Sequence, residues 1–260
     1  MGDLMVIRMR MLAALGAVAI ASAGCATATG GRLGELHRVA DTCPKGKKVA
    51  VYVAIDASGA QRGPQLLEAR VNAVRNIATK VAACGGHLRV LMFSASTAAT
   101  ITIFESTLEP KGATENARLR RVDGLVADVV EKVEAKLPEA LSRLSSQGSD
   151  PVGQLEGAHE YAVQVGQDFV LDVLIESSGI SRRVHPWELD DTLATKLAEE
   201  VSVPDLTGAT VTLAGIGRVG DGAPPSTDLV NALRTFYIRV CERTGATGCL
   251  ATTDITPIGG

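Results

Sequence analysis

Hydrophobic residues follow two patterns along the chain, and together they predict alternating strands and helices. Runs at 49–55 and 169–175 are apolar at nearly every position, which is typical of short strands buried on both faces of a sheet. Further runs of strand type lie at 87–93, 100–104 and 209–216. Their order predicts a doubly wound α/β fold, with a mostly parallel central sheet and helices on both faces.

Between these runs, apolar residues recur every three or four positions, as on one face of an amphipathic helix. The spacing predicts helices that begin near Pro64, Leu119, Val152, Asp191 and Thr227. We expect Pro138 to begin a new turn or kink, because proline lacks the N–H group that continues a helix. The segment 250–255 is expected to form a short edge strand or to lie along the surface.

The first residues have the pattern of an export signal. Arg8 and Arg10 precede the apolar run 11–23, and small residues then lead to Cys25. This run is shorter than the roughly 20 apolar residues that a membrane-spanning helix needs. Ser22-Ala23-Gly24-Cys25 resembles a bacterial lipobox, in which the cysteine becomes the lipidated first residue. The alternatives are a plain secretory signal and an apolar start that arose by chance.

These features predict three parts of the chain: a signal peptide over 1–24, a tether over 25–46 and one domain over 47–260. The lipid on Cys25 would hold the protein at the cell membrane, on its extracytoplasmic face. The formal net charge is −3, with 26 basic and 29 acidic residues, so the chain lacks the basic excess typical of nucleic-acid-binding proteins. We therefore expect no nucleic-acid partner.

Candidate binding residues follow the first apolar run. Asp56-Ala57-Ser58-Gly59-Ala60 places a carboxylate and a hydroxyl two residues apart at the end of a central strand. In open α/β sheets, ligands bind at this carboxyl edge, near the point where the strand order reverses. Asp56 and Ser58 are therefore expected to lie at a binding site.

This strand end resembles that of the von Willebrand factor A (integrin I-like) domain, whose first strand ends in Asp-x-Ser-x-Ser and helps to hold a divalent ion. Asp56 and Ser58 occupy the first two liganding positions, whereas Ala60 stands in place of the second serine. An alanine methyl group cannot coordinate a cation that prefers oxygen ligands. The resemblance covers residues 46–246 and implies that the strand pair 87–93 and 100–104 includes an antiparallel edge strand.

The same resemblance implies two further parts of a metal site. Gly148-Ser149-Asp150 resembles the family's Gly-Thr-Asp loop, so Ser149 either reaches the ion or, with Asp150, only caps the next helix. Where the family has Thr-Asp-Gly, the chain has Glu176-Ser177-Ser178-Gly179, and either Glu176 or Ser177 would take the place of the aspartate. Such a set would hold Mg²⁺ or a similar cation together with several waters.

Four cysteines remain if Cys25 carries lipid, an even number that suits an oxidising compartment. They permit three pairings, and four buried free thiols are the alternative. In the fold implied by the resemblance, the entry to the first strand and the end of the first helix share one end of the sheet, which favours Cys43–Cys84. Cys241–Cys249 would then close the turn after the last helix.

The loop over 180–191 contains Arg182, Arg183 and the sole tryptophan, Trp187. Because this loop is expected beside the ligand edge, these three residues are candidate partner contacts, aromatic and arginine residues being common interface anchors. The alternative is that Trp187 fills the core of its own domain.

Two enzymatic interpretations have weaker support. Gly215-Ile216-Gly217-Arg218-Val219-Gly220 matches a dinucleotide-binding pattern, but the next helix is expected only near 226–227, too late for its N-terminus to meet a pyrophosphate. We interpret the segment as a mobile loop. A hydrolase using Ser58, Asp56 and a histidine would lack a Gly-x-Ser-x-Gly elbow, and the histidines are scattered too widely for a zinc site, at His37, His87, His159 and His185.

Three hypotheses result. The first is a lipoprotein that binds a protein or cell-envelope partner at the carboxyl edge, through a weakly held divalent ion. The second is a metal-free extracytoplasmic scaffold, and the third is an enzyme. We favour partner binding without catalysis.

Overall fold

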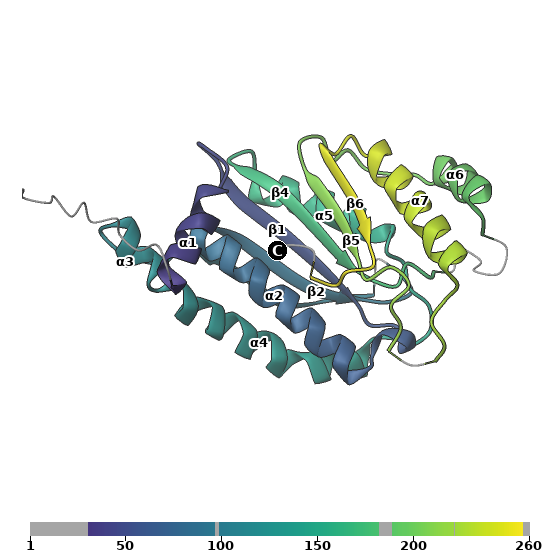
Figure 1. Ribbon diagram of the computed structural model, residues 1–260, viewed down its shortest axis with the longest axis horizontal. Helices are drawn as coiled ribbons and strands as arrows, with labels where there is room; N and C mark the ends of the chain where they lie inside the picture. Colours follow the sequence, from purple (N-terminus) through teal and green to yellow (C-terminus); the bar gives the residue numbers. More distant parts are fainter. Residues whose placement is uncertain (1–30, 97–98, 182–188, 221, 257–260) are drawn as a thin grey trace, which may run out of the picture.

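The computed structural model describes residues 31–96, 99–181, 189–220 and 222–256. Within these ranges, six strands form one sheet in the order β3-β2-β1-β4-β5-β6 (Figure 1). The strands are β1 (Lys48–Asp56), β2 (Gly86–Phe93), β3 (Thr100–Leu108), β4 (Phe169–Glu176), β5 (Thr210–Ala214) and β6 (Gly248–Thr252). β3 pairs antiparallel with β2, and the other neighbours pair parallel. The predicted doubly wound sheet with an antiparallel edge strand is confirmed.

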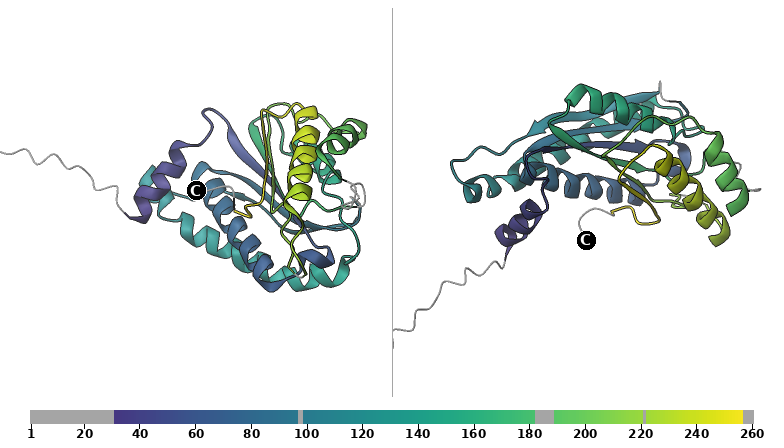
Figure 2. Two further views of the ribbon diagram at one scale, coloured as in Figure 1. Left: turned by 45° about the vertical axis from the view of Figure 1, so that its right-hand side comes forward. Right: turned by 90° about the horizontal axis from the view of Figure 1, so that it is seen from above.

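Helices cover both faces of this sheet (Figure 2). They are α1 (Arg32–Asp41), α2 (Pro64–Cys84), α3 (Glu115–Leu119), α4 (Val122–Arg143), α5 (Gly153–Val165), α6 (Asp191–Glu200) and α7 (Thr227–Arg243), with a 3-10 turn η1 at Gly59–Gln61. The buried side chains of α1, α2 and α4 form one core cluster, and those of α5, α6 and α7 form the other.

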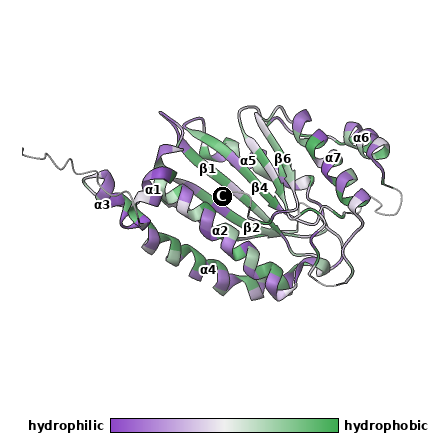
Figure 3. Cartoon of the chain, viewed as in Figure 1, coloured by the Kyte–Doolittle hydropathy of each residue, from purple (hydrophilic) through white to green (hydrophobic). Residues whose placement is uncertain are grey.

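Strand β1 separates the two clusters. Val49, Val51 and Val53 face the cluster of α2 and α4, whereas Tyr52 and its alanine neighbours face the cluster of α5. Because successive side chains of a strand point to opposite faces, a strand covered on both sides needs apolar residues at every position. Figure 3 shows this hydrophobic character along β1.

Helix α4 differs from the prediction, because it continues through Pro138 and ends at Arg143. A proline in a helix leaves the carbonyl four residues earlier without its hydrogen bond. Here that residue is Glu134, and both it and Pro138 are exposed, so water can satisfy the carbonyl. The buried Val133 and Ala140 hold the helix on the core from both sides of the proline.

Two segments at the ends of the fold extend the predicted pattern. Helix α1 lies within the range assigned to the tether, and its Leu36 is buried in the cluster of α2 and α4. The packed part of the chain therefore reaches back to Arg32. At the other end, β6 adds a parallel edge strand to β5 after the last helix, which decides between the two alternatives for the segment 250–255.

Both disulfides are confirmed. Cys43–Cys84 joins the segment after α1 to the end of α2, and Cys241–Cys249 joins α7 to β6. Each bond therefore ties a terminal element to the body of the fold. Among the helices of the described ranges, none has the length and hydropathy to cross a membrane.

Candidate binding site at the carboxyl edge of the sheet

The strand order reverses between β1 and β4. From β1 the chain crosses through α2 to β2 on one side, whereas β4 lies on the other side of β1. The connections that leave the two neighbouring strands therefore diverge and open a crevice at their carboxyl ends. Asp56 is the last residue of β1, and Ser177 directly follows β4, so both predicted residues lie at this point.

The carboxylate of Asp56 is fully buried and accepts hydrogen bonds from three directions. Its Oδ1 accepts from the backbone N–H of Ser58 at 2.8 Å. Its Oδ2 accepts from the hydroxyls of Ser149 and Ser177, each at 2.7 Å. The structure thus brings together four of the predicted site residues, Asp56, Ser58, Ser149 and Ser177, from three separate loops.

Local geometry fixes the loop after Asp56. A carboxylate that accepts from the N–H two residues later stabilises a tight turn, and η1 begins directly after Ser58. The turn is held against the loop after β5, where the N–H of Gly220 donates to the carbonyl of Ala60 at 2.7 Å. A Cβ atom at Gly63 would lie 2.7 Å from the Cα of Gly220, so this contact requires glycine.

The loop that carries Ser149 is fixed to β2. The N–H of Asp150 donates to the carbonyl of Ser94, directly after β2, at 3.1 Å, and the Asp150 carboxylate accepts from the N–H of Gly153 at 3.1 Å. Asp150 therefore stabilises the start of α5, while the hydroxyl of Ser149 turns toward Asp56. The contact at the start of α5 therefore belongs to Asp150, and the Ser149 hydroxyl contacts Asp56.

Glu176 lies on the other face of β4 from this cluster. Its carboxylate is 1% exposed, lies 4.0 Å from Nε of Arg70 on α2, and has no hydrogen-bond partner among the described residues. Burial raises the pKa of Glu176 from 4.5 to about 8, and the charge of Arg70 offsets only part of this shift. The carboxylate therefore does not join the three serines around Asp56.

Arg70 of α2 and Gln61 of η1 stabilise the carboxyl edge of the sheet, and neither residue was predicted from the sequence. The Arg70 guanidinium donates to the backbone carbonyl of Asp56 at 2.8 Å and also to the Gln61 side chain. Gln61 in turn donates to the carbonyl of Arg218 at 3.0 Å. A detectable signal existed: Arg70 falls four residues before Val74 on the apolar face of its helix, where a charged residue needs buried partners.

Beside the Asp56 cluster lies a cavity of about 260 Å³. Its walls include the hydroxyl residues Ser58, Ser149, Ser178 and Ser181, together with Ala60. The Ser181 hydroxyl is buried and has no hydrogen-bond partner within the described ranges, so it can serve a ligand. The cavity thus carries several hydroxyl groups, and none of its lining residues is charged.

The cluster contains the type of ligand atom that a hard cation would need, but only one formal charge. Asp56, Ser58, Ser149 and Ser177 offer oxygen donors, as Mg²⁺ prefers. Among them Asp56 supplies the charge, and within the described ranges no group of three or more His, Cys, Asp or Glu residues could hold a metal. Ala60 adds a methyl group where a further hydroxyl would strengthen the set.

Other predicted features lie elsewhere. Arg182, Arg183, Trp187 and Cys25 fall outside the described residues.

The glycine segment 215–220 follows β5 without entering a helix, since α7 begins at Thr227. His37, His87 and His159 contact Asn116, Tyr161 and the carbonyl of Asp205, respectively, so none of these three histidines serves Ser58.

Comparisons with known proteins concern the fold. No family model matches the chain, and a search of curated proteins finds no match. Solved structures with similar architecture include BatB from Bacteroides thetaiotaomicron, with 12% identity and a TM-score of 0.41 over 79% of this chain and 91% of that one. A von Willebrand factor type A protein from Catenulispora acidiphila has 12% identity and a TM-score of 0.42 over 82% of this chain and 40% of that one.

A third similar structure is proximal thread matrix protein 1 from the mussel byssus, with 15% identity and a TM-score of 0.45 over 82% of this chain and 45% of that one. The antiparallel pairing of β2 with β3 is the one that the resemblance implied. The fold is doubly wound α/β, with a mostly parallel sheet and one antiparallel edge strand. In this domain β6 follows the last helix, α7, and the function of the carboxyl edge rests on its own residues.

Proposed function

We propose that the protein binds a protein or cell-envelope partner at the carboxyl edge of its sheet, outside the cytoplasm. The observation that carries this proposal is the convergence of Ser149 and Ser177 on Asp56. Three loops meet there beside a cavity lined with hydroxyl groups. Such an arrangement offers directional hydrogen bonds at the place where open α/β sheets bind ligands.

We further propose that Mg²⁺ or a similar divalent cation assists this binding. Asp56, Ser58, Ser149 and Ser177 would hold the ion, which would supply a positive charge for an acidic group of the partner. Because these residues supply a single carboxylate, binding should be weak and most remaining ligands should be waters. The hydroxyls of Ser149 and Ser177 donate to Asp56 and would turn their lone pairs toward the ion.

A site-specific crosslinking experiment tests the partner hypothesis. A photoreactive amino acid is placed at residue 60, which is exposed and lines the cavity, or at residue 163 on α5, which is 71% exposed. We expect a discrete adduct in the native cell envelope from position 60 and not from 163. The adduct should weaken on addition of a chelator if the cation takes part.

The second half of this experiment uses Asp56→Asn, which removes the charge with little change of shape. It should abolish the adduct from residue 60 while the protein stays folded by circular dichroism. The absence of any adduct from position 60, or identical adducts from both positions, would rule out the edge as the contact.

The membrane anchor is part of the same proposal. Cys25 would carry lipid and place the domain at the extracytoplasmic face of the cell membrane. Disulfides at both ends of the described fold support an oxidising compartment. Mass spectrometry of the mature N-terminus provides the test: a chain that begins with lipidated Cys25 supports the anchor, and one that retains Met1 contradicts it.

One observation favours a scaffold without a ligand. The carboxylate of Asp56 is already satisfied by internal donors, as expected for a polar group that holds three loops together. The crosslinking experiment separates the two functions, because a scaffold gives no adduct that depends on the charge of Asp56. We propose no catalytic activity.

A further inference from the structure

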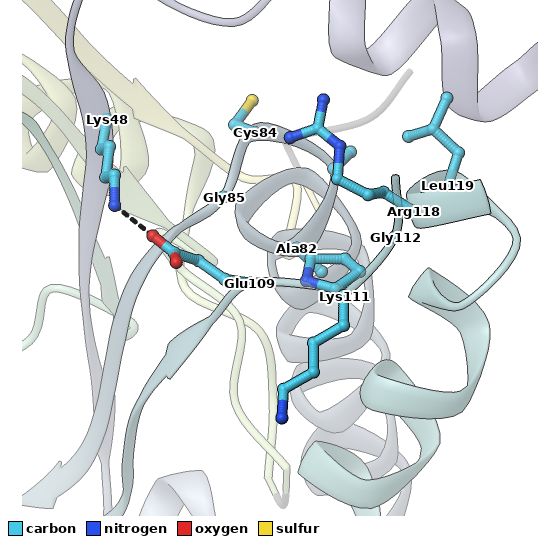
Figure 4. A pocket seen from close by; sticks show the side chains of 11 residues that line it. Lys48, Ala82, Cys84, Gly85, Glu109, Lys111, Gly112, Arg118 and Leu119 are labelled. Carbon is cyan, nitrogen blue, oxygen red and sulfur yellow. Dashed lines mark hydrogen bonds and ion pairs between the residues drawn. The ribbon is translucent and has the colours of Figure 1, made fainter. Parts of the chain in front are cut away.

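A second cavity, shown in Figure 4, is lined by Lys48 at the start of β1, whereas Asp56 is at the other end of that strand. It is bounded by the start of β1, the end of α2 and the segment from the end of β3 through α3. Its volume is about 510 Å³, which is within the range of small-molecule sites. Because it lies far from the carboxyl edge, it requires an explanation of its own.

The walls of this cavity carry an excess of positive charge. Lys48, Lys111 and Arg118 line it together with one carboxylate, that of Glu109. Lys48 forms an ion pair with Glu109, which accounts for both of those charges. Lys111 and Arg118 are both exposed, and within the described ranges their charged groups form no hydrogen bond or ion pair with the protein, so both can contact a ligand in the cavity.

Lys111 and Arg118 belong to two segments whose backbones are in close contact. A Cβ atom at Gly112 would lie 2.8 Å from the backbone nitrogen of Arg118, so the loop after β3 lies directly against α3. Figure 4 shows the Arg118 guanidinium turned toward Cys84, and the Lys111 side chain extending away from it. The flexible four-carbon stem of Lys111 allows its ammonium to turn toward a bound anion.

Other groups around the cavity indicate which chemical features, besides negative charge, a ligand should have. Ala82 and Leu119 give it an apolar wall, so the ligand should carry a small apolar portion. The C-terminal end of α2, at Cys84, contributes a partial negative charge of about half a unit. This is smaller than the two unpaired positive charges, and the cavity remains favourable for an anion.

We propose that this cavity binds a phosphate group attached to a ligand with a small apolar part. The guanidinium of Arg118 presents a planar set of donors that matches two phosphate oxygens, and the Lys111 ammonium adds a mobile point charge. The phosphate can belong to a soluble metabolite or to the headgroup of an anionic lipid, and these sources differ in charge and bulk.

Calorimetric titration of the full chain in a non-ionic detergent tests the proposal. The two probes are inorganic phosphate and glycerophosphoglycerol, the water-soluble headgroup of phosphatidylglycerol. We expect saturable binding of at least one probe. Arg118→Met should weaken it about tenfold or more, as for the loss of a hydrogen bond to a charged group, and Lys111→Met should weaken it several-fold.

The matched control is Arg120→Met, which removes the same charge from an exposed residue near the end of α3 that does not line the cavity. It should leave the affinity within about twofold. Tighter binding of phosphate identifies a soluble ligand, and tighter binding of glycerophosphoglycerol identifies a lipid headgroup. No saturable heat with either probe, or equal losses in the Arg118 and Arg120 variants, would overturn the proposal.

Discussion

The hydroxyl of Ser177 donates a hydrogen bond of 2.7 Å to Oδ2 of Asp56, between the carboxyl ends of β4 and β1. This contact spans the point where the strand order reverses. It joins the residue that ends the central strand to the residue that directly follows β4. Ser177 thus places an attractive hydrogen bond, and no second charge, beside the buried Asp56 carboxylate.

Ser177→Ala should lower the free energy of unfolding by about 1.5–3 kcal/mol, because it removes a hydrogen bond to a buried carboxylate. Ser58→Ala is the matched control, since the side chain of Ser58 makes no hydrogen bond within the described ranges and Asp56 accepts from its backbone. That control should cost less than about 0.5 kcal/mol. Urea denaturation monitored by circular dichroism gives both values, and equal losses would contradict the assignment.

Ala60→Ser should strengthen Mg²⁺ binding, because it adds an oxygen donor to the wall of the cavity beside Asp56. We expect a gain of about tenfold in affinity by calorimetric titration, roughly the effect of one added favourable interaction. Ser146→Ala, at another position lining the same cavity, should leave the affinity unchanged. If Mg²⁺ gives no saturable heat with either wild type or Ala60→Ser, the metal proposal fails while partner binding remains open.

Ser177→Asp should make stability depend on Mg²⁺. Without metal, two carboxylates would lie within hydrogen-bond distance in a buried site, and their repulsion should lower the melting temperature. Mg²⁺ binds the folded state and should restore the loss in proportion to its saturation. Thermal melts in millimolar Mg²⁺ and in a chelator provide the measurement. The control is Ser177→Asn, because asparagine has the shape of aspartate without its charge. Mg²⁺ should not raise the melting temperature of this variant.

The stability of the protein should fall as the pH rises from 4.5 toward 8, because Glu176 has a raised pKa in the folded state. Over this range the folded protein keeps a proton that the unfolded chain releases, so ionisation favours unfolding. The slope from this group is on the order of 1.4 kcal/mol per pH unit. Glu176→Gln should remove it, with stability close to wild type at pH 4 and higher at pH 8. An unchanged slope in the variant would show that another group is responsible.

The two disulfides should contribute unequally to stability. Cys43–Cys84 closes a separation of 41 residues and Cys241–Cys249 one of 8, so the chain-entropy relation gives about 4 and about 2.5 kcal/mol. The paired Cys→Ser variants, compared by chemical denaturation, should follow this order. A larger loss for Cys241–Cys249 would indicate that β6 depends on its bond for packing beyond the entropy of the loop.

Local patterns in the sequence determined the centre of the fold and part of the site. The run ending at Asp56 predicts a strand buried on both faces because each position must be apolar there. Asp56 and Ser58 are two residues apart, so their turn follows from local geometry. The pairing of Cys43 with Cys84 followed once the order of elements suggested the fold.

Tertiary structure decided what depended on distant partners. Glu176 and Ser177 are adjacent in sequence and fit the motif equally well, but neighbouring positions at the end of a strand point to opposite faces, so packing sent Glu176 toward Arg70 and left Ser177 beside Asp56. The continuation of α4 through Pro138 depended on which side of the helix met water. Sequence patterns thus fixed what each segment prefers locally, whereas the hydrogen bonds between loops required the assembled sheet.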